Sequence, residues 1–173
     1  MPAGMNLSTP LGTLTLRPMR DTEADAAFLY ALFVATKAEE MAAMPIDAAG
    51  KDFLLRMQFA SMTETYRREY PVARFDVVEL AGEPVGRIIT DVGEDCVTYV
   101  DIALLPRAQG HGLATALMLW LLEEPRRLGV PARVNVLAQN AASLRLCQRI
   151  GFVEVEHAPP FVRLEWREPP ALG

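Results

Sequence analysis

A glycine-rich segment at the start of an expected helix carries the clearest chemical signal in the sequence. The segment is Gln109-Gly110-His111-Gly112-Leu113-Ala114, and it follows the strongly apolar run Val100–Leu105. A helix N-terminus presents unpaired amides and a partial positive charge, so it suits a phosphate or pyrophosphate. Gly110 and Gly112 lack a Cβ, which lets a ligand approach the backbone closely. A glycine-rich turn without a ligand explains these residues equally well, so both interpretations stay open on this segment alone.

Two common nucleotide-binding motifs do not fit this segment. A P-loop needs a Gly-Lys pair followed by Ser or Thr, and the segment contains no lysine. The dinucleotide motif GxGxxG fails at its third glycine, where Thr115 stands. A ligand of this turn must therefore belong to another class.

A second segment, residues 140–152, lies one expected strand and one expected helix downstream of the first. Together the two segments resemble the GNAT superfamily of acyl-CoA N-acyltransferases. The first segment matches the family's Q/R-x-x-G-x-G/A cofactor motif at Gln109, Gly112 and Ala114. The second matches the family's Asn-x-x-Ala-x-x-Leu-Tyr…Gly-Phe signature at Asn140, Leu146, Gly151 and Phe152. The resemblance is closest over 100–117 and 134–152, extends over 74–166, and fades in the first 73 residues.

The resemblance implies a cofactor site between two parallel strands, 96–105 and 133–137, that splay apart. The pantetheine arm of CoA would enter this gap and pair with strand backbone as a missing strand would. Asn140 would hydrogen-bond that arm, although a helix N-cap explains Asn140 as well. The cofactor-binding residues that follow are Ile102, Ala103, Leu104, Gln109, Gly110, His111, Gly112, Leu113, Ala114, Thr115, Asn140 and Ser143.

Two positions of the second segment depart from the family. Ser143 replaces a frequent Ala, and Cys147 stands where the family commonly has a Tyr that protonates the departing CoA thiolate. Helical spacing places Cys147 on the apolar face toward the sheet. A thiol titrates near ~8.5, so Cys147 is a candidate proton donor, but a small buried core residue is the plainer interpretation. Tyr99, Tyr66 or water are the alternative donors.

The acceptor amine must lose a proton before it can attack a thioester, because an ammonium has no lone pair. Asp101 is an acid within an apolar strand beside the expected thioester site, so it is the first candidate for the general base. Glu79 and then Asp76 on the preceding hairpin are the next candidates. An ion pair between Asp101 and Arg87 is the structural alternative, and the sequence does not choose between the two.

The rest of the chain supplies elements to position these residues. Apolar periodicity and turn residues predict one α/β domain with a single mixed, mostly antiparallel sheet layered with about four helices. We expect a flexible N-terminus over 1–12, a single acyl-CoA N-acyltransferase domain over 13–168 and a tail over 169–173. The expected helices are capped by Thr22 or Asp21, begin near Asp47, open at the segment 109–114 and begin at Asn140. The expected strands are 13–17, 74–80, 84–91, 96–105, 133–137, 152–156 and 161–166.

The composition excludes several classes of function. The 173 residues carry 17 basic and 22 acidic side chains, a net charge of −5, so the basic footprint of a nucleic-acid-binding protein is absent. Two Cys and two His are too sparse for a zinc site or a disulfide framework. The longest apolar stretch, Leu113–Leu122, is about half of a membrane span. With no signal peptide visible, we expect a cytoplasmic protein without a metal, a nucleic-acid partner or a membrane anchor, and a homodimer is left open.

These observations lead to one main functional hypothesis and two alternatives. The main one is an acetyl-CoA-dependent N-acetyltransferase that transfers acetyl directly to a primary amine of a small molecule or peptide, with Asp101, Cys147 and Glu79 as the catalytic candidates. The first alternative is a CoA-binding module of the same fold with little or no catalysis. The second is a ping-pong enzyme with Cys147 as nucleophile, which lacks a visible His partner in the sequence.

Overall fold

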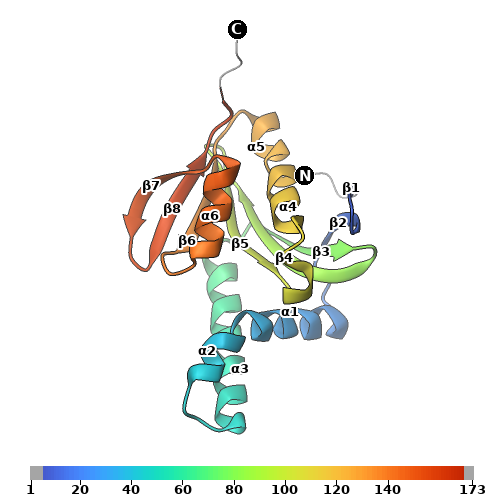
Figure 1. Ribbon diagram of the computed structural model, residues 1–173, viewed down its shortest axis with the longest axis vertical. Coiled ribbons are helices and arrows are strands. Elements are labelled where there is room, and N and C mark those ends of the chain that lie inside the picture. The colour runs from blue at the N-terminus through green and yellow to red at the C-terminus, as the bar shows by residue number, and fades with distance from the viewer. Residues whose placement is uncertain (1–5, 170–173) are drawn as a thin grey trace.

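The computed structural model describes residues 6–169 and builds them around one eight-stranded mixed sheet (Figure 1). The strand order is β1-β2-β3-β4-β5-β6-β8-β7, and β5–β6 is the parallel pair among otherwise antiparallel neighbours. The predicted fold class is thereby confirmed. The strands are β1 Asn6–Thr9, β2 Gly12–Pro18, β3 Arg74–Leu80, β4 Glu83–Val92, β5 Val97–Leu104, β6 Ala132–Leu137, β7 Val153–Ala158 and β8 Phe161–Trp166.

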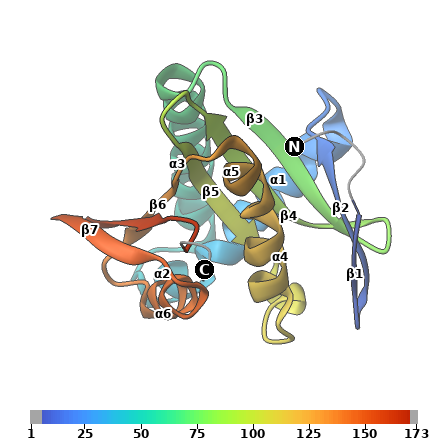
Figure 2. The same cartoon turned by 90° about the horizontal axis from the view of Figure 1, so that it is seen from above.

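Helices cover both faces of this sheet, as the view from above shows (Figure 2). Alternating strand residues feed two cores: Val78 and Ile88 pack with α4, whereas Phe75 and Ile89 face Leu29 of α1. The short helices α2 and α5 were not predicted, because each has only six residues and too little periodicity to detect. The helices are α1 Glu23–Thr36, α2 Ala38–Ala43, α3 Ala48–Glu69, α4 Leu113–Leu121, α5 Glu123–Leu128 and α6 Ala141–Ile150, with a 3₁₀ turn over Pro106–Ala108.

The ends of the chain only partly fall within the described residues. Residues 6–9, which lie in the segment expected to be flexible, form β1 and pair with β2. Residues 1–5 and 170–173, which include most of the expected tail, lie outside the described residues.

Helix starts follow the sequence signals closely. The Thr22 side chain accepts a hydrogen bond from the Asp25 amide at the start of α1, and Asp47 accepts one from the Gly50 amide at the start of α3. Both caps satisfy a backbone donor that has no partner within its helix. The two predicted helix starts are therefore confirmed with their physical cause.

Pro125 breaks the helical segment after the glycine-rich turn into α4 and α5. Because proline has no N–H, it cannot donate to the Leu121 carbonyl four residues earlier. The Tyr99 hydroxyl from the buried middle of the sheet donates to this carbonyl instead, with an O···O distance of 2.5 Å. This bond ties the end of α4 to the centre of β5.

A β-bulge at Val100 changes the direction of β5 where the site begins. Ile89 of β4 pairs with Asp101, but the next residue, Thr90, pairs with Tyr99, so Val100 has no partner on β4. A bulge of this kind changes which side chains face each side of a strand. It lets Val100, Asp101 and Ile102 all line the same cavity. Regular strand alternation would turn Asp101 to the face opposite Ile102, so the bulge is what brings this acid to the cavity.

A buried ion pair fastens α1 to the sheet. The Arg17 guanidinium of β2 donates to both carboxylate oxygens of Asp25 at 2.7 Å, and the Arg20 amide adds a third bond. The Arg17 hydrogen bonds lower the pKa of Asp25 to about 2. A carboxyl group whose pKa is lower in the folded state stabilises the fold fully at pH values above its pKa in the unfolded chain. The contribution of Asp25 is therefore complete above about pH 4 and is lost as the pH falls through about 2.

We therefore predict that Asp25→Asn lowers the free energy of unfolding at pH 7 by about 2 kcal/mol, the value of a shift of nearly two pKa units. The difference from the native protein should narrow below pH 4. Urea unfolding at pH 7, 4 and 3 measures both effects. The exposed Asp52, paired with Arg56 on α3, supplies the control Asp52→Asn with a much smaller change. A difference for Asp25→Asn that stays constant down to pH 3 would contradict this account.

Candidate active site

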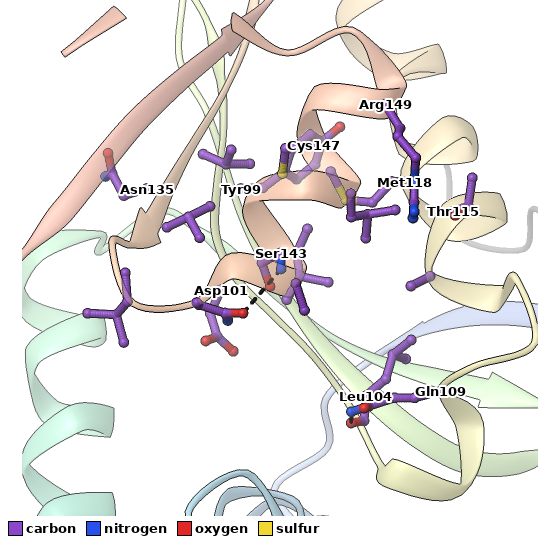
Figure 3. Close-up of a pocket in the computed structure, with 18 of the residues that line it drawn as sticks. Tyr99, Asp101, Leu104, Gln109, Thr115, Met118, Asn135, Ser143, Cys147 and Arg149 are labelled. Atoms are coloured by element: carbon purple, nitrogen blue, oxygen red, sulfur yellow. Dashed lines mark hydrogen bonds between the residues drawn. The ribbon is translucent and has the colours of Figure 1, made fainter. Parts of the chain in front are cut away.

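The one parallel ladder of the sheet is short, and a cavity opens where it stops. β5 and β6 pair at three positions only, ending at Tyr99 and Val134. Beyond this point the strands diverge around a cavity of about 690 Å³ that also reaches the starts of α4 and α6 (Figure 3). Residues of both segments singled out in the sequence line it. The expected splay between the two parallel strands is confirmed.

The turn before α4 leaves open space over its backbone. Gly110 and Gly112 have φ values of 81° and 76°, a left-handed conformation that favours glycine. A Cβ at either position would meet no heavy atom within 4 Å. Gly112 is also the N-cap of α4 and brings no side-chain acceptor to the first amides of that helix. The turn thus offers unobstructed amides at the edge of the cavity, as an anion site requires.

The Gln109 side chain holds this turn against the end of β5. Its Nε2 donates to the Leu104 carbonyl at 2.8 Å (Figure 3). That carbonyl retains a second lone pair for another donor. Gln109 therefore fixes the distance between the strand and the phosphate-type turn, a positioning role that the motif alone does not reveal.

The start of α6 forms the opposite wall. The Asn140 Oδ1 accepts a hydrogen bond from the Ser143 amide at 3.1 Å, so Asn140 is the N-cap of α6. Asn140 lines the cavity, and its side-chain amide nitrogen makes no hydrogen bond with any residue from 6 to 169. Capping and ligand binding are compatible at this residue.

Arg149 is a cavity residue that the sequence interpretation missed. Ala142, Leu146 and Arg149 recur at helical spacing on α6, a pattern visible in the sequence once the cavity side is known. Figure 3 shows the Arg149 side chain extending from α6 toward Thr115 at the start of α4. No residue in the described part of the chain pairs with its guanidinium. The Arg149 guanidinium therefore adds a positive charge to the α6 side of the cavity, which faces the start of α4.

The structure brings most, but not all, of the predicted cofactor residues to the cavity. Ala103 lies on the opposite side of β5 by strand alternation, Leu113 is buried in the core, and His111 is exposed in the turn. The predicted residues that line the cavity are Ile102, Leu104, Gln109, Gly110, Gly112, Ala114, Thr115, Asn140 and Ser143.

Asp101 lies at the cavity in an ion pair. Both Nε and Nη2 of Arg87 contact its Oδ2, at 2.8 and 2.7 Å. Its other oxygen, Oδ1, faces the Tyr66 hydroxyl of α3 at 3.5 Å. The ion pair with Arg87, which the sequence offered as the alternative to a catalytic role for Asp101, is thus present. It leaves Oδ1 with the long Tyr66 hydrogen bond as its contact.

The other acidic candidates are not brought to the cavity. Glu79 is ion-paired with Arg17, with 2.5 Å between Nε and Oε1. Asp76 lies on β3, where burial raises its pKa. Neither lines the cavity, because β4 separates their strand from β5.

Three side chains with ionisable protons face the cavity, and their surroundings differ. Cys147 is 5% exposed within the core cluster, and burial raises the pKa of its thiol. The Tyr99 hydroxyl is committed to the Leu121 carbonyl. Burial raises the pKa of Tyr66 to about 12, so its hydroxyl remains protonated at neutral pH. Among these three groups, the Tyr66 hydroxyl is protonated and has no backbone partner; its one hydrogen bond within residues 6–169 is the 3.5 Å contact with Asp101 Oδ1.

Residues 6–169 contain neither a metal-type cluster nor a membrane-spanning helix. No three His, Cys, Asp or Glu side chains gather as metal ligands. None of the helices in this part of the chain is long and apolar enough to cross a bilayer.

Comparison with solved structures shows the same fold in several proteins of low sequence identity. The PaiA N-acetyltransferase of Thermoplasma acidophilum, solved with coenzyme A, is 14% identical with a TM-score of 0.65 over 90% of this chain and 99% of its own. A GNAT-family acetyltransferase of Listeria monocytogenes gives the same identity and TM-score over 95% and 100%. The Campylobacter jejuni N-acetyltransferase PseH, solved with acetyl coenzyme A, is 14% identical with a TM-score of 0.57 over 90% and 99%.

Comparison at the level of sequence families identifies the chain. No curated protein matches it directly. The family model described as "Acetyltransferase (GNAT) family" matches residues 39–152, which is more than half of the chain and includes β5, both cavity-forming turns and α6. With the fold and the opening of the parallel pair in agreement, the chain belongs to the GNAT acetyltransferase family.

Proposed function

We propose that the protein is an acetyl-CoA-dependent N-acetyltransferase that transfers acetyl directly to a primary amine. The observation that carries this proposal is the cavity at the end of the β5–β6 ladder, because both sequence segments meet there. The cavity is lined by the glycine turn before α4 at one place and by Asp101 of β5 at another. The turn would bind the pyrophosphate of an acyl-CoA donor, and Asp101 would accept a proton from the amine.

The chain offers distinct groups to the two ends of the donor. The α4 turn and Arg149 would bind the pyrophosphate from opposite sides, one with amides and one with a guanidinium. The unpaired backbone of β5 beyond Tyr99 would hydrogen-bond the pantetheine arm, and Asn140 would do so from α6. Backbone N–H groups on β5 would polarise the thioester carbonyl that the donor supplies.

The amine would be deprotonated at Asp101. Its Oδ1 would accept the proton, because Arg87 occupies Oδ2 and fixes the orientation of the carboxylate, whereas Oδ1 is contacted by the Tyr66 hydroxyl at 3.5 Å. A neutral amine held beside the thioester attacks its carbonyl, and the C–S bond then breaks with release of a thiolate. Holding both reactants together supplies much of the rate.

Tyr66 would protonate the departing thiolate. It is a protonated hydroxyl that lines the cavity from α3, the side of the sheet opposite α6. Cys147 would instead pack against the sheet. Its raised pKa also opposes a ping-pong mechanism, which requires the thiolate form as nucleophile.

The second candidate function is a CoA-binding module without catalysis. The absence of the family's frequent Tyr at position 147 and the engagement of Asp101 by Arg87 favour it. Both functions require CoA binding, and only the first requires turnover. A thiol-release assay with acetyl-CoA against amino acids, polyamines, aminoglycosides and peptides separates them: turnover on at least one class supports the enzyme, and CoA binding without turnover supports the module.

Ligand binding to the native state alone must stabilise the fold. We expect CoA to raise the melting temperature of the protein, with a gain of roughly 2.7 kcal/mol at a hundredfold excess over Kd. Differential scanning fluorimetry and calorimetry measure this. No shift and no heat at millimolar CoA would remove the basis of both candidate functions.

Arg149 and Arg145 form a matched pair on α6, because both are exposed arginines and only Arg149 lines the cavity. Arg149→Gln should weaken CoA binding about tenfold or more, the weight of one charge-assisted hydrogen bond. Arg145→Gln should leave the Kd within about twofold. Isothermal titration calorimetry of both variants provides the test, and equal losses would show a general charge effect rather than a contact.

Two substitutions distinguish the candidate proton donors. Tyr66→Phe should reduce kcat by roughly 10²–10⁴-fold, the usual contribution of a general acid, with little change in CoA affinity. Cys147→Ala should lower stability and leave kcat nearly unchanged. Steady-state kinetics and melting curves of both variants measure these effects. A large loss of kcat in Cys147→Ala with a nearly unchanged kcat in Tyr66→Phe would instead make Cys147 the proton donor.

A further inference from the structure

Buried apolar side chains form the floor of the cavity at the end of the β5–β6 ladder. They come from four elements, and none is more than 9% exposed: Tyr99 of β5, Met118 of α4, Val134 and Val136 of β6, and Cys147 of α6. Tyr99 and Val134 are the last paired residues of the ladder, so this floor lies where the two strands begin to part. All five residues also belong to the main hydrophobic core, which the cavity therefore reaches.

The floor offers little to a polar ligand group. Its one hydroxyl, on Tyr99, donates to the Leu121 carbonyl at 2.5 Å. Burial raises the pKa of the Cys147 thiol, and a neutral thiol is only a weak hydrogen-bond donor. The charged and amide side chains that line the cavity stand at other positions. Because a polar group buried without a partner is costly, the floor suits an apolar group.

The course of an acyl-CoA through the cavity decides which of its groups reaches the floor. The glycine turn follows the C-terminal end of β5, and Gln109 ties it to Leu104. A pantetheine arm that starts at this turn runs back along β5 toward Tyr99. The amides of the arm pair with the strand, and the thioester comes after them. The acyl chain is then the part of the donor that lies nearest to the end of the ladder.

The acceptor amine would approach from the other side of the sheet. Asp101, the proposed base, faces the Tyr66 hydroxyl of α3. The floor is instead completed by Met118 and Cys147 from α4 and α6, and these helices cover the face opposite α3 (Figure 2). An acyl chain on the floor therefore leaves the space beside Asp101 to the amine.

We propose that the cavity floor binds the acyl chain of the donor and accepts chains longer than acetyl, such as propionyl and butyryl. Cys147 and the two valines have small side chains. Met118 is unbranched with three rotatable bonds, so it can change conformation to fit chains of different length. This inference rests on the proposed function and extends its donor class to short acyl thioesters of CoA.

Unreactive thioethers of CoA test the floor without an acceptor amine. S-ethyl-CoA has the chain length of acetyl-CoA, and S-butyl-CoA is longer by two methylenes. Each methylene buried in an apolar site strengthens binding about fourfold, so S-butyl-CoA should bind the native protein at least about tenfold more tightly than S-ethyl-CoA. Isothermal titration calorimetry measures both dissociation constants.

Two neighbouring residues of α4 provide a variant and its matched control. Met118 lines the cavity, whereas Leu119 is 46% exposed and lies outside it. Met118→Ala deepens the floor and should raise the affinity of S-hexyl-CoA relative to S-butyl-CoA by about fourfold over the native ratio. Leu119→Ala should keep the native ratio. Because two ligands are compared in each variant, a general change in CoA affinity does not alter the ratio.

Cys147→Leu tests the floor in the opposite direction. The larger side chain fills the space, so the advantage of S-butyl-CoA over S-ethyl-CoA should fall to about twofold or less. If this variant does not fold, the Met118→Ala and Leu119→Ala pair decides the proposal alone. Equal affinity of the native protein for the two thioethers, or chain-length ratios that Met118→Ala leaves unchanged, overturns the acyl site while CoA binding remains. A protein that binds neither CoA nor any thioether would instead overturn the proposed function itself.

Discussion

The architecture depends on the early end of one strand ladder. Parallel strands normally continue to pair along their length, but β5 and β6 separate after Tyr99 and Val134. The opening lies on the β6 side of β5. On the opposite side, β5 continues to pair with β4 past the bulge at Val100. Unpaired backbone groups inside a protein are costly, so this opening is stable only where water or a ligand satisfies them. An extended polar ligand is what such an opening accommodates.

The same position also explains how the helices are held beside the opening. Tyr99 is the last paired residue of β5, and its hydroxyl bonds the Leu121 carbonyl that Pro125 leaves without a donor. The break between α4 and α5 is therefore coupled to the point where the strands part. Because Gln109 ties the start of α4 to Leu104, the helix is fixed at both ends to β5. The turn between them has little freedom to move relative to the strand, which preorganises an anion site.

Local signals in the sequence predicted the elements and the two ends of the site well. Some features depend only on residues that are neighbours in the sequence, and these could be predicted without a structure. They are the helix caps at Thr22, Asp47 and Asn140 and the turn at Gly110–Gly112. The ion pair of Asp101 with Arg87 on the neighbouring strand was an alternative that the sequence could not choose. The partner of Glu79 was not foreseen, because its ion pair with Arg17 joins strands that are far apart in sequence. Arg149 and Tyr66 were missed or ranked low for the same reason: their value depends on which helix face meets the opening. A single sequence does not reveal which residues of distant strands and helices face one another.

A crystal structure with bound CoA tests the central claim most directly. The account predicts the pantetheine arm between β5 and β6 beyond Tyr99 and Val134, with hydrogen bonds to the backbone of β5, and the pyrophosphate on the amides of the Gly110–Gly112 turn. Gln109 should keep its bond to Leu104, since it positions the turn before the ligand arrives. CoA bound elsewhere on the protein, or a β5–β6 ladder that closes past Tyr99 in the complex, would contradict the account.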